Sequence, residues 1–328
     1  MKVLVIRFSS IGDVVLTTPV LRALREQLPN AEIHFLTKRS FSSLLANNPN
    51  IDKLHCIERS VREVLPELKA EKFDRVIDLH NNIRTLELKL RLGVKAHSFP
   101  KLNLDKWLLV RFKNRKMPDV HVVDRYFQAV KQLGVVNQPS NCKLVIPADQ
   151  KVDVEQVFGL IPHSYVCIAI GAQFATKRMP MNILKEVIEL INFPIVLSGG
   201  PTDSELAEAL VNAFPEKKII SAAGTFSLLQ SADIVRQAKV LLTNDTGLMH
   251  IATCFRVPIV SVWGNTVPEL GMYPYYPQNK ALYSIHEVKD LSCRPCSKIG
   301  FQACPKGHFN CMQQQDTEKI AADLRKHF

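Results

Sequence analysis

The stretch "KVLLTNDTGLMHIATCF", residues 239–255, joins two structural patterns across a short polar turn. Residues 239–244 form an apolar run typical of a buried strand, and residues 247–255 fit a helix. Asp245, Thr246 and Gly247 stand at the junction, and His250 lies one helical turn further on. Such residues either cap the helix or bind an anion at its N-terminus, and the stretch by itself leaves both explanations open.

The same alternation of apolar strands and amphipathic helices runs through both halves of the chain. It is interrupted by a basic, helical stretch at about residues 102–141, and residues 313–328 are predicted to form a terminal helix. This order predicts an α/β protein with two Rossmann-like, doubly wound domains facing a central cleft, residues 1–150 and 151–312. We expect strands at residues 2–8, 31–38, 52–58, 73–80, 94–100, 164–172, 193–200, 217–224, 239–244 and 257–264.

The composition is that of a soluble globular protein, with 46% hydrophobic and 22% charged residues in a chain of 328. No apolar run reaches the ~20 residues that a membrane-spanning helix needs. The first ten residues, MKVLVIRFSS, lack a small-residue cleavage site and continue into strand, turn and helix. We therefore interpret them as a core strand rather than a signal peptide and expect a cytoplasmic protein.

The positive charge is concentrated in the first half of the chain. Residues 1–150 hold 25 Lys and Arg against 15 Asp and Glu, whereas residues 151–328 hold 17 against 16. A one-sided basic surface suggests an acidic partner, such as nucleic acid, anionic lipid or a phosphorylated substrate. A lysine-rich solvated surface is the other explanation.

The first strand is followed by "RFSSIGD", residues 7–13. A dinucleotide-binding fold would carry G-x-G-x-x-G here, but only Gly12 is present, so we exclude NAD binding. A P-loop is absent as well. The turn presents Ser9, Ser10 and Asp13 at the carboxyl end of the strand. Asp13 can cap the following helix or act as a general base, and its spacing alone favours the cap.

Polar residues also follow two predicted strands of the second half. Gln173 and Lys177 lie in the loop after residues 164–172, where a lysine can neutralise a phosphate or simply be a solvated charge. Asp203 follows residues 193–200 and can accept hydrogen bonds from ribose hydroxyls.

A helix starting at residue 247 would offer free backbone N–H groups and a partial positive charge to a diphosphate. Thr246 adds a hydroxyl, Gly247 allows close approach, and His250 returns to the same helix face. Asp245 would repel a diphosphate, so we interpret it as a cap or as a partner of sugar hydroxyls. Together these junctions predict a nucleotide-diphosphate donor held by the second half and an acceptor held by the first.

Two of these segments resemble the signature regions of the glycosyltransferase family 9 heptosyltransferases, which transfer heptose from ADP-heptose to the lipopolysaccharide inner core. They are "RFSSIGDVVLTTPVLRALR", residues 7–25, and "TNDTGLMHIA", residues 243–252. "FDRVIDLHNNIRT" and "GGPTDSELAE" are similar to family segments too, so the resemblance covers nearly the whole chain. It implies a GT-B fold whose terminal helix, residues 313–328, crosses back to the N-terminal domain.

The resemblance also implies roles for individual residues. Asp13 becomes the catalytic base, in place of the capping role favoured by spacing. Gln173 stands where the family has a small polar residue. The implied donor-binding residues are Gln173, Lys177, Asp203, Asp245, Thr246, Gly247 and His250, and the acceptor or phosphate contacts are Arg7, Ser9, Ser10 and Gly12.

The implied reaction is an inverting displacement that needs no cofactor. Asp13 accepts the proton of an acceptor hydroxyl as its oxygen attacks the anomeric carbon, and ADP leaves from the opposite face. The negative charge that develops on the leaving ADP is stabilised by the helix N-terminus, Thr246, His250 and Lys177. No divalent metal is required, and the sequence has no Asp-x-Asp motif to bind one.

The resemblance gives the basic first half an acidic, lipid-linked saccharide acceptor as its partner. Residues 101–116, KLNLDKWLLVRFKNRK, hold six basic residues against one acidic, with Trp107 and Phe112 among the apolar ones. Such a stretch suits the anionic cytoplasmic face of the inner membrane. A core-packing helix with a basic outer face explains it equally well.

Four cysteines form the pattern C-x2-C-x7-C-x6-C near the end of the chain. Four thiolates can bind a structural zinc ion, although these spacings match no standard finger. Reduced thiols in a surface loop are the alternative. The four residues are Cys293, Cys296, Cys304 and Cys311.

Three other functions stay open at this point. A related transferase could use another nucleotide sugar, and a non-catalytic protein could retain only the donor site. A nucleic-acid binder fits the charge, but the sequence carries no nucleic-acid-binding motif, so we expect no such partner. The sequence does not predict an oligomeric state.

Overall fold

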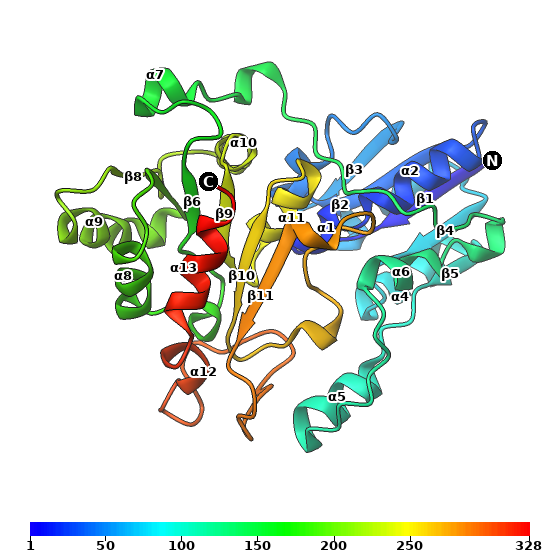
Figure 1. Ribbon diagram of the computed structural model, residues 1–328. Helices are drawn as coiled ribbons and strands as arrows, with labels where there is room; N and C mark the ends of the chain where they lie inside the picture. The colour runs from blue at the N-terminus through cyan, green and yellow to red at the C-terminus, as the bar shows by residue number, and fades with distance from the viewer. The chain divides into compact units, whose positions relative to one another are not determined.

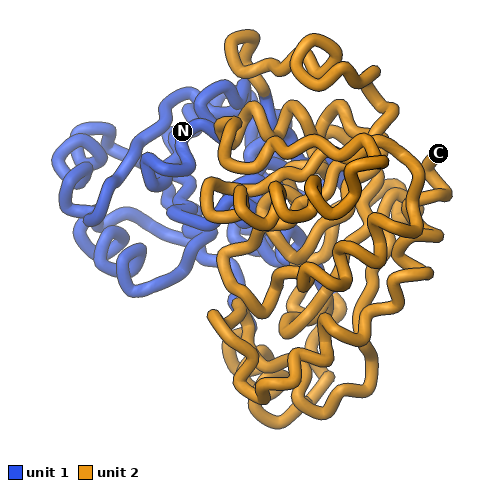
Figure 2. Tube along the Cα trace, turned by 90° about the vertical axis from the view of Figure 1, so that its left-hand side faces the viewer, with its two compact units in different colours: residues 1–102, 120–145 blue, residues 103–119, 146–328 orange.

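The computed structural model describes all 328 residues. The chain folds into two compact units, shown in Figure 2. Unit 1 comprises residues 1–102 and 120–145, and unit 2 comprises residues 103–119 and 146–328. The segment 103–119, which we expected in the first domain, therefore belongs to unit 2. No helix combines the length and the apolar character that crossing a membrane would require.

Unit 1 is built on a five-stranded parallel sheet with the strand order β3-β2-β1-β4-β5. The central strand β1 (Lys2–Ile6) is almost wholly buried, because helices cover both faces of a parallel sheet. The other strands are β2 (Glu32–Lys38), β3 (Lys53–Ile57), β4 (Arg75–Asp78) and β5 (Ala96–Ser98). The helices are α1 (Ile11–Val15), α2 (Thr18–Gln27), α3 (Leu65–Ala70), α4 (Ile83–Leu92) and α6 (Val122–Phe127).

Local sequence sets the helix ends of unit 1. Pro19 lies in the first turn of α2, where its missing N–H costs nothing, so the chain breaks into α1 and α2 there. Asn82 caps α4 by accepting a hydrogen bond from the Thr85 backbone N–H at 3.0 Å. Gly93 ends α4 in the left-handed conformation, with φ of 65°, which glycine adopts without strain.

Unit 2 is built on a six-stranded parallel sheet with the order β11-β10-β9-β6-β7-β8 (Figure 1). Its strands are β6 (Val166–Ala169), β7 (Ile195–Ser198), β8 (Ile219–Ser221), β9 (Val240–Asn244), β10 (Ile259–Trp263) and β11 (Tyr283–Glu287). Its helices are α5 (Asn103–Phe112), α7 (Val154–Phe158), α8 (Met181–Glu189), α9 (Ser204–Ala213), α10 (Leu228–Arg236), α11 (Gly247–Cys254), α12 (Asn310–Gln313) and α13 (Thr317–Arg325).

Helices cover both faces of the sheet in unit 2. Side chains of α8, α9 and α13 share one hydrophobic core with the strands, and side chains of α7, α10 and α11 share the other. The α13 helix buries Ile320, Ala321 and Leu324 in the first of these cores. This differs from the expected packing of the terminal helix on the N-terminal domain, because its apolar face is used inside unit 2.

The two parallel sheets confirm the predicted α/β class and the two Rossmann-like halves. Strand β11 is the element that the sequence pattern missed. All five of its residues are only partly buried, since it lies at the sheet edge, and its sequence YSIHE lacks the apolar run that identified the other strands.

Candidate active site

The carboxyl end of β1 in unit 1 carries a buried arginine with three partners. Arg7 is 8% exposed, and its Nη2 atom lies 2.6 Å from Asp13 Oδ1. Its Nε donates to the Ser9 carbonyl at 2.8 Å, and its Nη1 donates to the Leu79 carbonyl. Burial disfavours the charge of Arg7, but the Asp13 carboxylate outweighs this effect and the pKa of Arg7 is raised. The guanidinium therefore holds the Asp13 carboxylate in a fixed position.

Asp13 is the third residue of α1, and its second carboxylate oxygen closes the start of that helix. Oδ2 accepts hydrogen bonds from the Ser10 hydroxyl at 2.9 Å and the Ser10 backbone N–H at 3.2 Å. These contacts form one half of a capping box. The capping contacts thus leave the Asp13 side chain 20% exposed.

Two further residues of unit 1 surround Asp13 and Arg7 and were missed in the sequence. His80 follows β4, and its ring packs 5.0 Å from the Phe8 ring. Burial, reinforced by the charges of Arg7 and Lys101, lowers the pKa of His80 to about 3, so the imidazole is neutral. Burial raises the pKa of Tyr126 far above its ordinary value. A polar residue just after a parallel strand was the available signal for His80.

In unit 2 the loop after β6 and the end of β9 are joined by an ion pair. Lys177 Nζ lies 2.6 Å from Asp245 Oδ2, and the Thr266 hydroxyl donates to the same oxygen at 2.9 Å. Asp245 is therefore not the helix cap that we considered. Thr246 occupies the N-cap position of α11, and its Oγ1 lies 3.2 Å from Thr243 Oγ1.

The α11 helix begins at Gly247, as predicted, and no side chain caps its first turn. His250 lies one turn into the helix and is 2% exposed. The start of α11 thus combines backbone N–H groups with Thr246, His250 and the paired Lys177. This combination suits an anion, since an uncapped N-terminus carries about half a positive charge.

Asp203 is held deep in the turn after β7. Its Oδ2 accepts a hydrogen bond from the Gly200 N–H at 2.8 Å, and its Oδ1 lies 3.2 Å from Arg178 Nη1. A side chain at Gly171 would meet the carboxylate, because a Cβ there would lie 2.1 Å from Asp203 Oδ2. The structure thus brings Asp203 together with Arg178 and the end of β6. Gln173, which lies in the loop after β6, is exposed.

The comparison with protein families matches residues 61–300 to glycosyltransferase family 9 (heptosyltransferase). The chain belongs to glycosyltransferase family 9. The crystal structure of the glycosyl transferase family 9 from Veillonella parvula DSM 2008 is 26% identical, with a TM-score of 0.82 over 99% of this chain and 96% of that one. Lipooligosaccharide heptosyltransferase 2 of Haemophilus influenzae is 24% identical over 300 residues, covering 82% of this chain and 85% of its own.

A third similar protein is E. coli heptosyltransferase WaaC with ADP, which shares 20% identity and a TM-score of 0.69 over the full length of both chains. These similarities agree with the GT-B fold that the resemblance implied. Family membership makes the chain a glycosyltransferase, so the polar residues at the strand ends belong to an enzyme.

In this family 9 glycosyltransferase, Asn265 is a candidate site residue that sequence reasoning missed. It follows β10, next to Thr266, and is 1% exposed. Neither the nitrogen nor the oxygen of its amide has a hydrogen-bond partner. Leaving a buried polar group unpaired costs about 1–3 kcal/mol. A bound ligand would supply the missing partners at this position beside Asp245 and Thr266.

The cysteine-rich segment of the enzyme supports the strand end that carries Asn265. Cys296 donates its backbone N–H to the Asn265 carbonyl at 3.1 Å. Arg294 is 2% exposed, and it donates to the carbonyls of Gly264 and Thr266. The segment therefore braces the turn after β10.

The structure does not bring three of the four cysteine thiols within 4.8 Å of one another, the spacing that a shared metal ion would need. Cys293 Sγ lies 3.9 Å from His308 Nε2, and the Cys296 thiol donates to the Cys293 carbonyl. Burial raises the pKa of Cys296 to about 11 and that of Cys311 to about 12. In the metal-free protein both residues are therefore protonated thiols at neutral pH.

Proposed function

We propose that this glycosyltransferase transfers heptose from ADP-heptose to the inner core of lipopolysaccharide with inversion at the anomeric carbon. The observation that carries the proposal is the arrangement at the carboxyl edge of the unit 2 sheet. There the uncapped start of α11 carries Thr246 at its N-cap and His250 in its first turn, and the Lys177–Asp245 pair lies at the end of the preceding strand. The heptosyltransferase of H. influenzae and the ADP complex of the E. coli enzyme support this donor.

The donor diphosphate binds at the N-terminus of α11 in this proposal. Lys177 neutralises Asp245, which would otherwise repel the phosphates, and its other hydrogens remain available for phosphate oxygens. Asp245 and the unpaired amide of Asn265 accept and donate hydrogen bonds to sugar hydroxyls. Gly247 has no side chain to obstruct the ligand.

The nucleoside part of the donor is assigned to the loops after β6 and β7. Asp203 is engaged by Gly200 and Arg178, so its main contribution is to fix these two loops against each other. Gln173 is exposed on the first loop and is free to contact the nucleoside. These assignments place the hydrogen-bonding residues around the donor without a resident cofactor.

Asp13 is the proposed general base. It accepts the proton of an acceptor hydroxyl while that oxygen forms a bond to the anomeric carbon and the bond to the ADP oxygen breaks. Arg7 and Ser10 orient the carboxylate, and Ser9 with Gly12 shapes the turn that meets the acceptor. The charge that develops on ADP is stabilised by Thr246, His250, Lys177 and the α11 N–H groups, so no metal enters this step.

The acceptor is proposed to be acidic and lipid-linked, because the basic charge is concentrated in particular segments. Unit 1 holds 20 Lys and Arg against 12 Asp and Glu, and the segment 103–119 holds 5 against 2. The α5 helix buries Leu109 on Val267 and Leu270. It leaves Trp107 49% exposed and Phe112 61% exposed. Apolar side chains among basic ones suit the surface of an anionic membrane.

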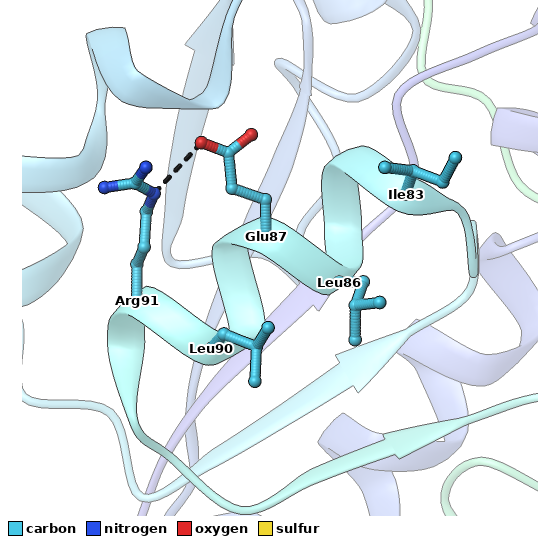
Figure 3. Close-up of a pocket in the computed structure, with 5 residues that line it drawn as sticks. All are labelled: Ile83, Leu86, Glu87, Leu90 and Arg91. Atoms are coloured by element: carbon cyan, nitrogen blue, oxygen red, sulfur yellow. Dashed lines mark hydrogen bonds and ion pairs between the residues drawn. The ribbon is translucent and has the colours of Figure 1, made fainter.

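A second exposed apolar stripe lies on α4 in unit 1. Ile83, Leu86 and Leu90 line a shallow hollow with Glu87 and Arg91, as Figure 3 shows. The ion pair between Glu87 and Arg91 borders it at 3.0 Å. The stripe recurs at helical spacing, so it presents one continuous apolar strip that a lipid chain could contact.

Calorimetric binding of ADP, UDP and GDP tests the donor assignment, using the wild type and the His250→Ala and Asp245→Ala variants. Preferred binding of ADP that is weakened in His250→Ala, and is unchanged or tighter in Asp245→Ala, supports it. Preference for UDP or GDP would indicate a transferase for another nucleotide sugar. Transfer to a lipopolysaccharide acceptor, followed by NMR of the new anomeric bond, tests the reaction. Binding of ADP without transfer would contradict the proposed catalysis.

A further inference from the structure

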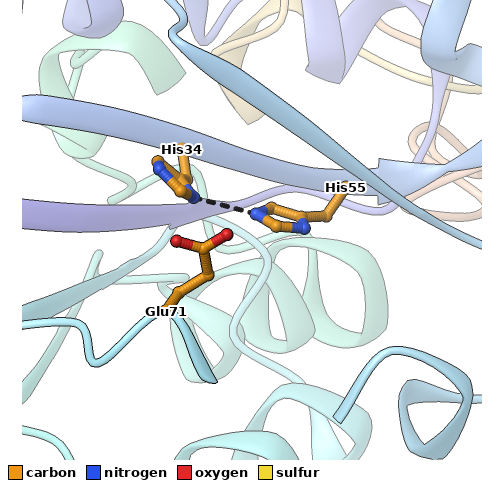
Figure 4. Close-up of side chains that lie close together, drawn as sticks. All are labelled: His34, His55 and Glu71. Atoms are coloured by element: carbon orange, nitrogen blue, oxygen red, sulfur yellow. Dashed lines mark hydrogen bonds between the residues drawn. The ribbon is translucent and has the colours of Figure 1, made fainter. Parts of the chain in front are cut away.

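Unit 1 contains a cluster of titratable side chains away from Asp13, on one face of the β2–β3 strand pair. His34 of β2 and His55 of β3 are 0% and 1% exposed, and His34 Nδ1 lies 2.9 Å from His55 Nε2. Glu71 follows α3, and its carboxylate lies beside the gap between the two facing nitrogens (Figure 4). One ligand atom of each residue lies within 4.8 Å of the other two.

The outer nitrogen of each ring is held by a further carboxylate. His34 Nε2 lies 2.8 Å from Glu32 Oε1, and His55 Nδ1 lies 2.8 Å from Glu67 Oε1. An ionised carboxylate only accepts hydrogen bonds, so each imidazole carries a proton on that outer nitrogen. The facing nitrogens then both present lone pairs across 2.9 Å, which is repulsive unless a cation lies between or beside them.

The charged groups around the rings also lack one positive charge. Glu32, Glu67 and Glu71 supply three negative charges, and Lys2 and Lys53 supply two positive ones. Lys2 Nζ lies 2.7 Å from Glu71 Oε2, and Lys53 Nζ lies 2.6 Å from Glu71 Oε1, so the Glu71 carboxylate is paired with both lysines. With neutral imidazoles the cluster therefore has one excess negative charge that a bound cation would offset.

The protein around the rings fits a metal ligand set. Metal-bound histidines usually donate their outer N–H to a carboxylate, which fixes the ring and makes it a better ligand, as Glu32 and Glu67 do here. The Phe73 ring packs edge-on against both imidazoles, 5.1 Å from His34 and 6.3 Å from His55, and shields that side from water.

We propose that His34 Nδ1, His55 Nε2 and a carboxylate oxygen of Glu71 bind a divalent transition metal, with Zn²⁺ as the best fit. Two imidazoles and one carboxylate form a ligand set between hard and soft, which suits Zn²⁺. A water molecule would complete the tetrahedral coordination. Zinc–ligand distances of about 2.0–2.1 Å require facing atoms about 3.3 Å apart, so the rings separate by only a few tenths of an ångström on binding.

The site has a structural role, because it ties β2 and β3 to the end of α3. His34 and His55 lie in the sheet, whereas Asp13 follows the carboxyl end of β1, so the metal is not part of the transfer reaction. A proton shared by the two rings is the competing occupant. Zinc binding would displace that proton, and affinity would fall as the pH is lowered.

The test uses the full chain, freed of metal with a chelator and titrated with Co²⁺ and with Zn²⁺. We expect one equivalent of Co²⁺ with visible d–d bands and no thiolate charge-transfer band, and a higher Tm with Zn²⁺. His34→Asn and His55→Asn should weaken binding at least tenfold, and Glu71→Gln less. His97→Gln is the matched control in the same unit, and Cys293→Ser with Cys296→Ser removes two of the four cysteines that were the other candidate metal ligands.

Far-UV circular dichroism and urea unfolding show whether each variant is folded, and Glu71→Gln keeps the test valid if a histidine variant does not fold. Binding that survives in the histidine variants and in Glu71→Gln would overturn the proposal, as would binding lost in the cysteine variant. Absence of metal binding, with ¹⁵N NMR showing one proton shared between the rings, would also overturn it and identify the cation as a proton.

Discussion

Lys177 and Asp245 form an ion pair, with 2.6 Å between Nζ and Oδ2, that joins the loop after β6 to the end of β9. Because the proposed diphosphate site adjoins this pair, its two charges have opposite effects on ADP. We expect Lys177→Ala to weaken ADP binding about tenfold or more, which corresponds to about 1.4 kcal/mol, since Asp245 is left unneutralised. Asp245→Asn should leave ADP affinity unchanged or increase it, because one negative charge is removed.

Calorimetry with ADP and with the nucleotide sugar separates these effects. Asp245→Asn should raise the Kd of the sugar donor more than that of ADP, since Asp245 is assigned to sugar hydroxyls. Lys280→Ala is a matched control, because it removes an exposed lysine of the same unit. Equal ADP affinity in the wild type and Lys177→Ala would show that the lysine does not face the phosphates.

Asp13→Asn should lower the transfer rate about 10²–10⁴-fold, the usual contribution of a general base. The amide oxygen still accepts hydrogen bonds from Arg7, so the fold and the ADP affinity of unit 2 should be retained. Asp13→Ala should in addition lower the free energy of unfolding by about 1–3 kcal/mol, because the buried Arg7 loses its partner. Transfer rates, ADP titrations and urea unfolding measure these effects. Normal transfer by Asp13→Asn would exclude it as the base.

The sequence pattern predicted the parallel strands because both of their faces are buried, so they appear as continuous apolar runs. It also located the polar residues at the carboxyl ends of β1, β6, β7 and β9. The edge strand β11 escaped detection, since its residues are half-buried and mixed in polarity. The segment 103–119 groups with unit 2 and not with the first half, where we expected it, because Leu109 and Met117 pack with Val267 and Leu270 and Lys113 donates to the Pro295 carbonyl.

Pairings between distant residues could not be predicted, because they depend on strand register. His34 and His55 meet only because His55 of β3 pairs with Leu36 of β2, which places it on the same face as His34. The contact between Lys177 and Asp245 likewise depends on β6 and β9 being neighbours. Asn265 carried no local signal, since an unpaired amide is recognisable only when its surroundings are known.

His80 makes the stability of unit 1 depend on pH. Its pKa in the folded protein is about 3, below the ~6.5 of an unfolded histidine, so the unfolded chain binds more protons between these values. Stability from this residue is present above pH 6.5 and is lost as the pH falls toward 3, by at most about 1.4 kcal/mol per pH unit. His80→Gln should flatten this dependence in urea unfolding between pH 7 and pH 4. An unchanged slope would mean that His80 is protonated in the folded state.

The exposed aromatic residues of α5 should anchor the enzyme to anionic lipid. Trp107 and Phe112 project among basic residues, so replacing both with serine should lower binding to anionic vesicles several-fold, while added salt should weaken binding of the wild type. Ile161→Ser is the matched control, because this side chain is 69% exposed but lies outside the basic segment. Vesicle flotation at low and high salt measures the binding. Vesicle binding that changes neither with salt nor with the serine substitutions would mean that α5 does not contact lipid. The basic segment would then bind the soluble saccharide part of the acceptor.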